Sequence, residues 1–267
     1  MDDRFEGDWL SLRQSADHRA RLNEATDACL AWCGGRGGLS VVDLGCGQGS
    51  GMQFLAERLT SGSRWLLVDH DPAHLDAASA AAASIGVEAE TRVVDLAAAD
   101  FHSLLEGRDL VTCAALIDLV SEDWLDRMVE AVMARAGALL VATSIDGRVG
   151  WSPELAFDRD MHALVRAHER RDKGFGPSLG GEAASTLERK LQSQGVSVVT
   201  AAADWDLAET QAPLQQAYLA GIVQAALEQA PDRSDRIRAW ANQRRAAIEG
   251  GRSRLIVGHA DLFATVR

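Results

Sequence analysis

A glycine-rich segment that follows an apolar run holds the residue types with the clearest chemical meaning. Residues 39–44 lead into Gly45, Gly47 and Gly49, and the acidic residue Asp43 precedes the first of these glycines by two positions. Alternate glycines let a backbone turn sharply and approach a ligand closely. A helix that starts there would present free N–H groups to the same ligand. The segment therefore predicts a site for a nucleotide-like molecule.

The spacing of the glycines separates two kinds of ligand. A dinucleotide fingerprint requires G-x-G-x-x-G, but Ser50 stands where the last glycine would be. The carboxylate of Asp43 would repel a pyrophosphate and attract a ligand that carries an amino group. Both residues argue against a nicotinamide-dependent dehydrogenase, which we keep as an alternative.

Further motifs follow in an order that resembles the class I S-adenosylmethionine-dependent methyltransferases. Asp43 and the glycines match the family's first motif, and Asp69 matches the acid that binds the ribose hydroxyls. A carboxylate can accept two hydrogen bonds from a vicinal diol. The resemblance covers about residues 39–143. It places Asp95 and Leu96 beside the adenine.

The resemblance implies S-adenosylmethionine as cofactor and S-adenosylhomocysteine as product, with no metal. It also places the strand 109–116 beneath the reacting methyl group. The cofactor-binding residues that it implies are Asp43, Gly45, Gly47, Gly49, Asp69, His70, Asp95, Leu96 and Ala114.

The elements that position these motifs alternate between apolar runs of strand length and helical segments. This alternation is typical of a parallel sheet with crossover helices. Expected strands are 39–44, 65–68, 87–94, 110–114, 138–143 and 196–200, with 254–266 as a last strand or hairpin. One helix is expected over 12–32. The predicted fold class is α/β, a doubly wound, seven-stranded, mostly parallel Rossmann-like methyltransferase sheet with a helical cap, the last strand being antiparallel by resemblance.

The same pattern predicts the organisation of the chain. An N-terminal helical segment (1–38) precedes the S-adenosylmethionine-binding core (39–145), which is followed by a cap or lid insertion (146–180). The C-terminal part of the sheet (181–267) contains a two-helix insertion at about 209–251.

Candidate catalytic groups lie after the fourth and fifth expected strands. Asp118 follows the fourth strand and would hold or deprotonate an acceptor, although a cap for the helix beginning near Ser121 explains it equally well. Asp146, Arg148 and Trp151 follow the fifth strand, at the sheet edge where ligands bind. Arg148 would fix a carboxylate or phosphate, and a simple turn is the alternative.

A second group of candidates lies outside the core. His168 and Lys173 flank a glycine-rich loop with Phe175, which we interpret as a lid with His168 as a candidate catalytic residue; a charged helix end is the alternative. Trp9 and Arg13 precede the sheet and would line the site if the N-terminal helix covers the cofactor. We expect Arg148, Trp151, Lys173, Phe175, Trp9 and Arg13 to bind substrate.

Composition limits the partners and the location. Lys and Arg number 27 and Asp and Glu 39, a formal net charge of −12, which argues against a nucleic-acid partner. An arginine-rich stretch at 232–254 is a solvated helix face or, alternatively, a lip for an anionic substrate. No apolar run has the length of a membrane span, and the start lacks signal-peptide character. We expect a cytoplasmic protein without a membrane partner.

The predicted function is methyl transfer from S-adenosylmethionine to oxygen or nitrogen of a small molecule, with carbon as an alternative acceptor atom. A covered pocket suits a small molecule better than a macromolecule. Two alternatives keep the cofactor: donor cyclisation or aminopropyl-type transfer on the same fold, and a non-catalytic cofactor-binding subunit.

Overall fold

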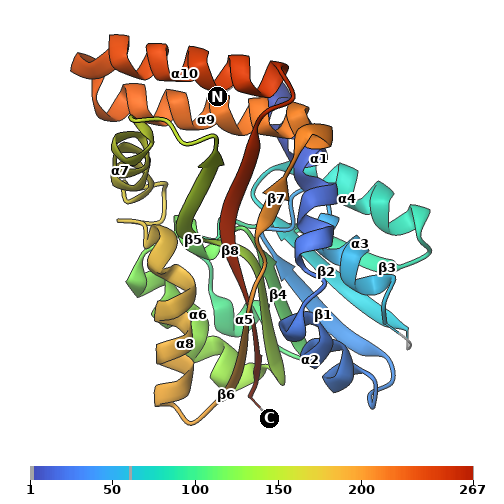
Figure 1. The fold of residues 1–267 in the computed structure, drawn as a ribbon. Helices are drawn as coiled ribbons and strands as arrows, with labels where there is room; N and C mark the ends of the chain where they lie inside the picture. The colour runs from blue at the N-terminus through green and yellow to red at the C-terminus, as the bar shows by residue number, and fades with distance from the viewer. Residues whose placement is uncertain (1–2, 60–61, 267) are drawn as a thin grey trace.

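A computed structural model describes residues 3–59 and 62–266 (Figure 1). The strands are β1 (Leu39–Leu44), β2 (Ser63–Asp69), β3 (Glu88–Val93), β4 (Leu110–Ala114), β5 (Ala138–Ser152), β6 (Ser197–Ala202), β7 (Trp205–Leu207) and β8 (Arg254–Thr265). The α-helices are α1 (Asp3–Ala20), α2 (Glu24–Cys33), α3 (Ser50–Ala56), α4 (Pro72–Ser84), α5 (Phe101–Leu104), α6 (Glu122–Arg135), α7 (Asp158–Glu169), α8 (Ala183–Ser193), α9 (Ala212–Gln229) and α10 (Ser234–Glu249).

The strands form one mixed sheet in the order β3-β2-β1-β4-β5-β8-β6, with the short β7 also paired to β8. The pairs from β3 to β5 are parallel, whereas β8 runs antiparallel to β5, β6 and β7. The predicted doubly wound, mostly parallel sheet with an antiparallel late strand is therefore confirmed. The last strand, β8, is a single long element rather than a hairpin.

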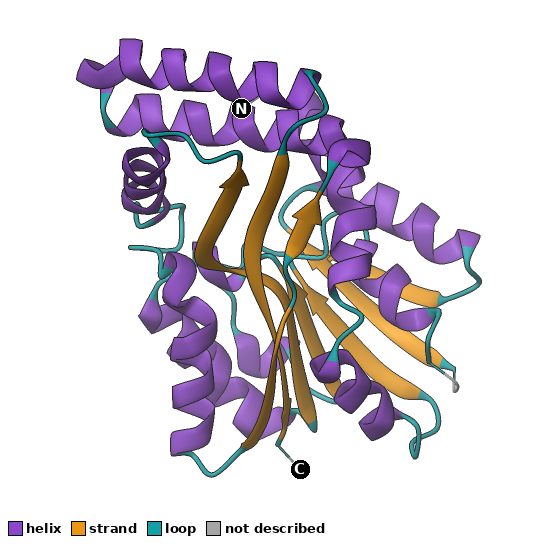
Figure 2. Ribbon diagram, viewed as in Figure 1, coloured by secondary structure: helices purple, strands orange, loops and turns teal. Residues whose placement is uncertain are grey.

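Helices cover both faces of the sheet (Figure 2). The apolar side chains of α5, α6 and α8 pack on one face, and those of α2, α3 and α4 pack on the other. Strand β1 is buried along its whole length, as its continuous apolar run requires for a central parallel strand.

A third apolar cluster lies beyond the ordinary length of the sheet and forms the cap. Helices α7, α9 and α10 pack there against β7 and the extended parts of β5 and β8 (Figure 1). The expectation that β5 ends at residue 143 is wrong: it continues to Ser152, with irregular register after Val141 and Ile145, because β8 supplies it with a pairing partner. Asp146, Arg148 and Trp151 are thus strand residues rather than loop residues.

The N-terminal helix is also divided, contrary to the expectation of one helix over 12–32. The side chain of Asn23 accepts hydrogen bonds from the backbone N–H groups of Ala25 and Thr26, at 3.1 and 3.2 Å. Such an N-cap starts a new helix, so α1 ends at Ala20 and α2 begins at Glu24. The break frees α1 to lie across the sheet edge.

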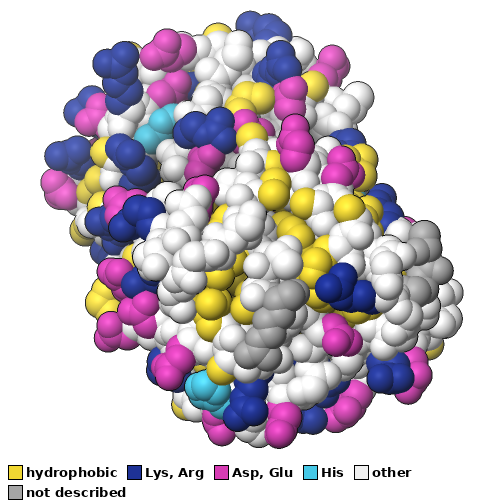
Figure 3. Space-filling view, turned by 90° about the horizontal axis from the view of Figure 1, so that it is seen from below, with side chains coloured by type: hydrophobic (Ala, Val, Ile, Leu, Met, Phe, Trp, Pro, Cys, Tyr) yellow, Lys and Arg dark blue, Asp and Glu magenta, His cyan; other side chains and the backbone are white. Residues whose placement is uncertain are grey.

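The surface opposite the cap carries Lys or Arg and Asp or Glu side chains interspersed around its rim (Figure 3). That face shows no continuous basic area of the kind that a phosphate backbone needs. Within the described ranges, no helix combines the length and the hydropathy needed to cross a membrane.

Candidate functional site

A cavity of about 260 Å³ lies at the carboxyl edge of β1, β4 and β5. The glycine loop after β1 forms one wall, and Ala114, Ala115 and Thr143 line another. Helix α1 contributes the remaining side through Leu10, Arg13 and neighbouring residues, so the cavity lies under this helix. The sequence-based suggestion that the N-terminal helix covers the site agrees with this placement.

The glycine loop has the geometry that the motif predicts. Gly45, Gly47 and Gly49 have φ angles of 68°, 51° and 84°, which residues other than glycine rarely adopt. A Cβ at Gly47 would lie 3.6 Å from Leu10 of α1, so the loop and the covering helix are close together. The Gly47 N–H donates to the Asp69 carboxylate at 2.9 Å, which ties the loop to the end of β2.

Asp43 is a buried acid in the wall of this cavity. Its side chain accepts a hydrogen bond from the hydroxyl of Thr112 at 2.8 Å, and burial raises its pKa to about 6. A Cβ at Gly51 would lie only 3.1 Å from the Asp43 carboxylate, so the glycine leaves room for the acid. Thr112 and Gly51 were not predicted, although the sequence G-S-G after the motif is a readable signal for Gly51.

Arg21 is a functional candidate that sequence reasoning missed. It directly follows α1, is 3% exposed and lines the cavity. Its guanidinium lies 4.4 Å from the centre of the Phe54 ring, and its Nε is buried without a hydrogen-bond partner. Burial lowers the pKa of Arg21, and the fields of Asp261 and Asp43 act in the opposite direction. A buried cation without a direct partner is costly unless something pairs with it.

The ends of β4 and β5 hold two residues in an unusual conformation. Ala115 and Thr143 have φ angles of 52° and 50°, and both line the cavity. Residues other than glycine in this region store strain and tend to occur at functional sites. The Ala115 N–H donates to the Ala142 carbonyl at 2.9 Å, which joins the two strained strand ends.

Asp118 lies just beyond this edge, in a short 3-10 turn (Ile117–Leu119). Its Oδ1 is buried without a partner, and burial raises its pKa to about 6. The cap of α6 is Ser121, whose hydroxyl accepts from the Trp124 N–H at 3.3 Å. The alternative of Asp118 as a helix cap is therefore wrong, and its role as a base stays a prediction.

The residues expected around ribose and adenine lie at the ends of β2 and β3. Asp69 is 5% exposed and also accepts from the Asp71 N–H at 3.0 Å, and His70 Nδ1 lies 3.2 Å from its Oδ1. Asp95 accepts from the Ala97 N–H at 2.9 Å, and the Leu96 carbonyl accepts from a tryptophan indole. Asp69, Asp95 and Leu96 do not line the cavity.

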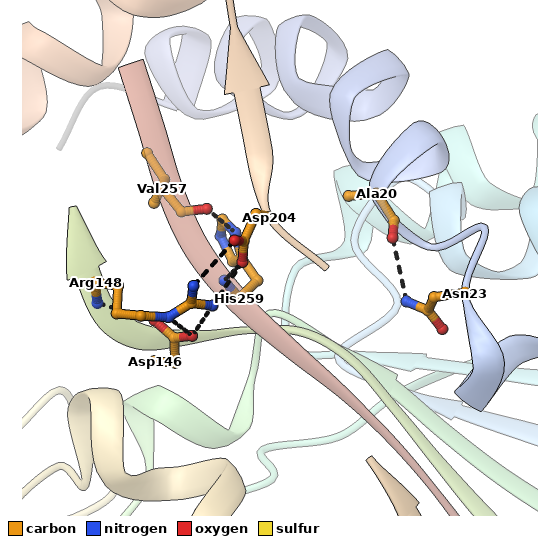
Figure 4. A network of polar contacts seen from close by, with 7 residues as sticks. All are labelled: Ala20, Asn23, Asp146, Arg148, Asp204, Val257 and His259. Atoms are coloured by element: carbon orange, nitrogen blue, oxygen red, sulfur yellow. Dashed lines mark hydrogen bonds and ion pairs between the residues drawn. The ribbon is translucent and has the colours of Figure 1, made fainter. Parts of the chain in front are cut away.

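The predicted anion-binding arginine, Arg148, is engaged by two carboxylates (Figure 4). Its Nε donates to Asp146 at 2.7 Å, and its two terminal nitrogens donate to Asp204 at 3.0 and 2.7 Å. Asp204 also accepts from the His259 backbone N–H at 3.2 Å. Asp146 and Arg148 thus join β5 to the β6–β7 loop, and neither lines the cofactor cavity.

Other predicted substrate residues lie in two different settings. Trp151 is 6% exposed and packs in the cap, with its ring centre 6.3 Å from that of Tyr218. Phe175 packs against Trp124, with their ring centres 6.0 Å apart. Arg13 does line the cavity. The cap and core therefore use Trp151 and Phe175 for packing.

The candidates His168 and Lys173 lie near α9, whereas Trp9 and Arg13 lie on α1. His168 Nε2 lies 2.9 Å from Glu228 of α9, and the Lys173 ammonium lies 3.4 Å from the other ring nitrogen. This group joins α7 to α9 and does not line the cavity. The guanidinium of Arg13 lies 5.8 Å from the centre of the Trp9 ring.

Within the described ranges, no group of three or more His, Cys, Asp or Glu side chains is arranged to hold a metal ion. The four cysteines are free and buried. The site therefore consists of the glycine loop, two buried charged residues and the strained ends of β4 and β5.

Comparison with known proteins bears on this site. Residues 41–136 match the family model described as a methyltransferase domain. The YcgJ protein from Bacillus subtilis has a similar structure over 90% of this chain and 96% of its own, with a TM-score of 0.53 and 15% identity. The mycolic acid cyclopropane synthase CmaA1, solved with S-adenosylhomocysteine, has a similar structure over 88% of this chain and 82% of its own. Its TM-score is 0.50 and its sequence identity is 13%. No curated protein sequence matches significantly.

The sheet order and the glycine loop after β1 thus belong to a methyltransferase domain with the Rossmann-like fold. Residues 41–136 are a methyltransferase domain, as the motifs predict, and S-adenosylmethionine is the cofactor that class I methyltransferases use.

Proposed function

We propose that the cavity binds the amino-acid end of S-adenosylmethionine between Arg21 and Asp43. The observation that carries this proposal is Arg21, a buried guanidinium in the cavity wall whose Nε has no partner and which forms no ion pair with the described residues. A guanidinium fits a carboxylate with two parallel hydrogen bonds. Asp43 lies in the same cavity and would accept from the ammonium group. The two side chains thus match the opposite charges of a zwitterion.

The remaining cofactor contacts keep their predicted roles within this proposal. Asp69 would accept hydrogen bonds from the ribose hydroxyls, beside the loop that it already holds through Gly47. Asp95 and Leu96 would lie at the adenine. Helix α1 covers the site, and excluding water favours transfer to the acceptor rather than to solvent.

We infer that the acceptor is an oxygen or nitrogen atom of a small molecule. The bound cofactor supplies an activated methyl group, and the protein must align the acceptor with it and remove a proton. Asp118 is our candidate for the base that accepts that proton, because its Oδ1 is buried and has no partner. The cap over the extended β5 supports a small acceptor, and the free cysteines support a location in the cytoplasm.

The test is calorimetric titration with S-adenosylmethionine, S-adenosylhomocysteine and NADH. We expect micromolar binding of the two sulfur compounds and none of NADH. Arg21→Met should weaken binding by at least tenfold, since each lost charge-assisted hydrogen bond contributes about 1.5–3 kcal/mol. Arg19→Met, at an exposed position in the last turn of α1, is the matched control. Equal binding by both variants would contradict the proposal.

The product separates methyl transfer from the alternatives. Incubation with candidate acceptors should release S-adenosylhomocysteine. Release of methylthioadenosine would indicate aminopropyl-type transfer or donor cyclisation instead. Binding without any product across a broad set of acceptors would favour a non-catalytic subunit.

A further inference from the structure

A second cavity, of about 580 Å³, lies between α7 and the extended part of β5. Arg159, His162 and Arg166 line it from α7, and the segment Gly147–Gly150 lines it from β5. Their spacing of three and four residues places the three side chains on one face of the helix. This cavity shares no lining residue with the one under α1.

The two arginines are not neutralised by neighbouring carboxylates. Neither Arg159 nor Arg166 makes a side-chain hydrogen bond or an ion pair with a residue in the described ranges. Asp158 and Asp160 flank Arg159 in sequence, but Asp158 is buried in an ion pair with Arg244 and Asp160 is paired with Arg233 at 3.7 Å. No Asp or Glu lines this cavity, although the chain has an acidic balance of −12. The two guanidinium groups therefore face this cavity without a direct carboxylate partner among the described residues.

His162 adds a polar group with no partner. Its Nε2 is buried and makes no hydrogen bond. Burial lowers the pKa of His162, Asp158 opposes this, and Arg166 and Arg244 lower it further. Buried polar nitrogens are normally satisfied. An acceptor bound in the cavity would satisfy this one.

Two other charged residues nearby bear on where a ligand would lie. Arg148 also lines the cavity, but its guanidinium is held by Asp146 and Asp204. An adjoining cavity of about 320 Å³ contains Glu169, whose pKa burial raises to about 7. Its negative charge is therefore partial at neutral pH, and it acts on Arg166, which lines both cavities.

We propose that Arg159, His162 and Arg166 form a binding site for a small phosphate-bearing anion, separate from the methyl-transfer site. Guanidinium groups bind phosphate oxygens bidentately, and a histidine can donate to a third. The glycines of the facing β5 segment leave its backbone open to close approach by a ligand. A small anion fits better than a nucleic acid, because the net charge of the chain repels an extended phosphate backbone.

The test uses pyrophosphate as the probe, at constant ionic strength, with binding followed at the His162 ring by NMR. A His162→Asn variant assigns the resonance. We expect pyrophosphate to shift the His162 signal and to raise its pKa, because a nearby anion favours the charged ring. The affinity of Arg159→Ala/Arg166→Ala should be at least tenfold lower. The matched control is Arg135→Ala/Arg238→Ala, which removes two exposed arginines elsewhere.

The readout at His162 is independent of the cofactor, so its failure is distinct from a failure of the S-adenosylmethionine titration. A His162 signal that pyrophosphate does not move would overturn the proposal. Equal weakening by the two double variants would also overturn it, since that outcome reflects net charge alone. Citrate serves as a comparison. If citrate binds as tightly as pyrophosphate, the site does not select phosphate, and the proposed ligand class is wrong. Tighter binding of a DNA duplex would contradict a small ligand.

Discussion

The carboxylate of Asp261 in β8 accepts a hydrogen bond from the backbone N–H of Thr143 in β5, at 2.6 Å. The other oxygen of Asp261 accepts from the Asn23 side chain at 2.8 Å. Asp261 is fully buried, and burial raises its pKa. Thr143 has a φ of 50° and lines the cofactor cavity. A buried acid outside the cavity thus holds both the strained strand end and the start of α2.

We expect Asp261→Ala to weaken S-adenosylhomocysteine binding and to lower stability, because it leaves the Thr143 N–H buried without an acceptor. Such an unsatisfied group costs about 1–3 kcal/mol. Urea denaturation measures the stability, and calorimetry measures the binding. Asp261→Asn keeps an acceptor oxygen for the Thr143 N–H. It should therefore retain more of the stability and of the binding affinity than Asp261→Ala does. An alanine variant that binds and unfolds like the wild type would show that Thr143 does not depend on Asp261.

Arg21 gives opposite expectations for stability and for binding. The guanidinium is buried and forms no ion pair with the described residues, so it costs stability in the free protein. Arg21→Met should raise the melting temperature of the free protein and abolish the stabilisation that S-adenosylhomocysteine confers on the wild type. Differential scanning calorimetry with and without the ligand tests both. A lower melting temperature of the free variant would assign Arg21 a structural role instead.

The buried acid Asp43 predicts a pH dependence of cofactor binding. Its pKa is raised by burial to about 6, so the carboxylate is ionised at pH 7 and becomes protonated as the pH falls through that value. A protonated acid attracts an ammonium group less. Affinity for S-adenosylhomocysteine should therefore fall below pH 6, by at most about tenfold per pH unit. Titrations between pH 5 and pH 8 measure this.

Two variants isolate the contribution of Asp43. Asp43→Asn should bind more weakly at pH 8 and lose the change near pH 6. Asp118→Asn should keep it, although the pKa of Asp118 is also raised to about 6. If Asp118→Asn abolishes the change and Asp43→Asn does not, we have assigned the ammonium to the wrong acid.

The sequence predicts the sheet and the glycine loop well because both depend on local patterns. A continuous apolar run marks β1, and the acid and glycines that follow it occupy the expected turn. It did not predict Arg21, because the relevant signal is the N-cap Asn23, which ends α1 and leaves the arginine at the cavity. Thr143 and Asp261 are 118 residues apart in the chain. Their relation depends on pairing between strands, which no local pattern encodes.

The same limit explains why residues 146–151 form part of a strand rather than the expected turn. Local reasoning gives a turn after residue 143, but the distant β8 extends β5 through this segment. Arg148 then meets Asp204, which lies in another part of the chain. The predicted substrate arginine Arg148 is therefore part of a structural ion pair, whereas Arg159 and Arg166 on α7 have no carboxylate partner among the described residues.

The buried pair of Asp158 and Arg244 is expected to hold the cap together. Both residues are buried, the two side chains form an ion pair, and Trp240 donates to Asp158 at 2.7 Å. Arg244→Ala should lower the free energy of unfolding by about 3–5 kcal/mol, because it leaves a buried carboxylate unpaired. Urea denaturation followed by tryptophan fluorescence tests this. Arg245→Ala, at an exposed neighbouring position, is the control and should have little effect.

Asp118 is the last residue whose role is open to a direct test. If its carboxylate accepts the proton of the methyl acceptor, Asp118→Asn should lower kcat by about 100-fold or more, the usual contribution of a positioned base. Its affinity for S-adenosylhomocysteine should be unchanged. The wild-type rate should rise as the pH increases through about 6, because burial raises the pKa of Asp118 to that value and the base must be ionised. The asparagine variant should lose this rise. Full activity of Asp118→Asn would remove it as the base, and the acceptor would then need no proton transfer to this position.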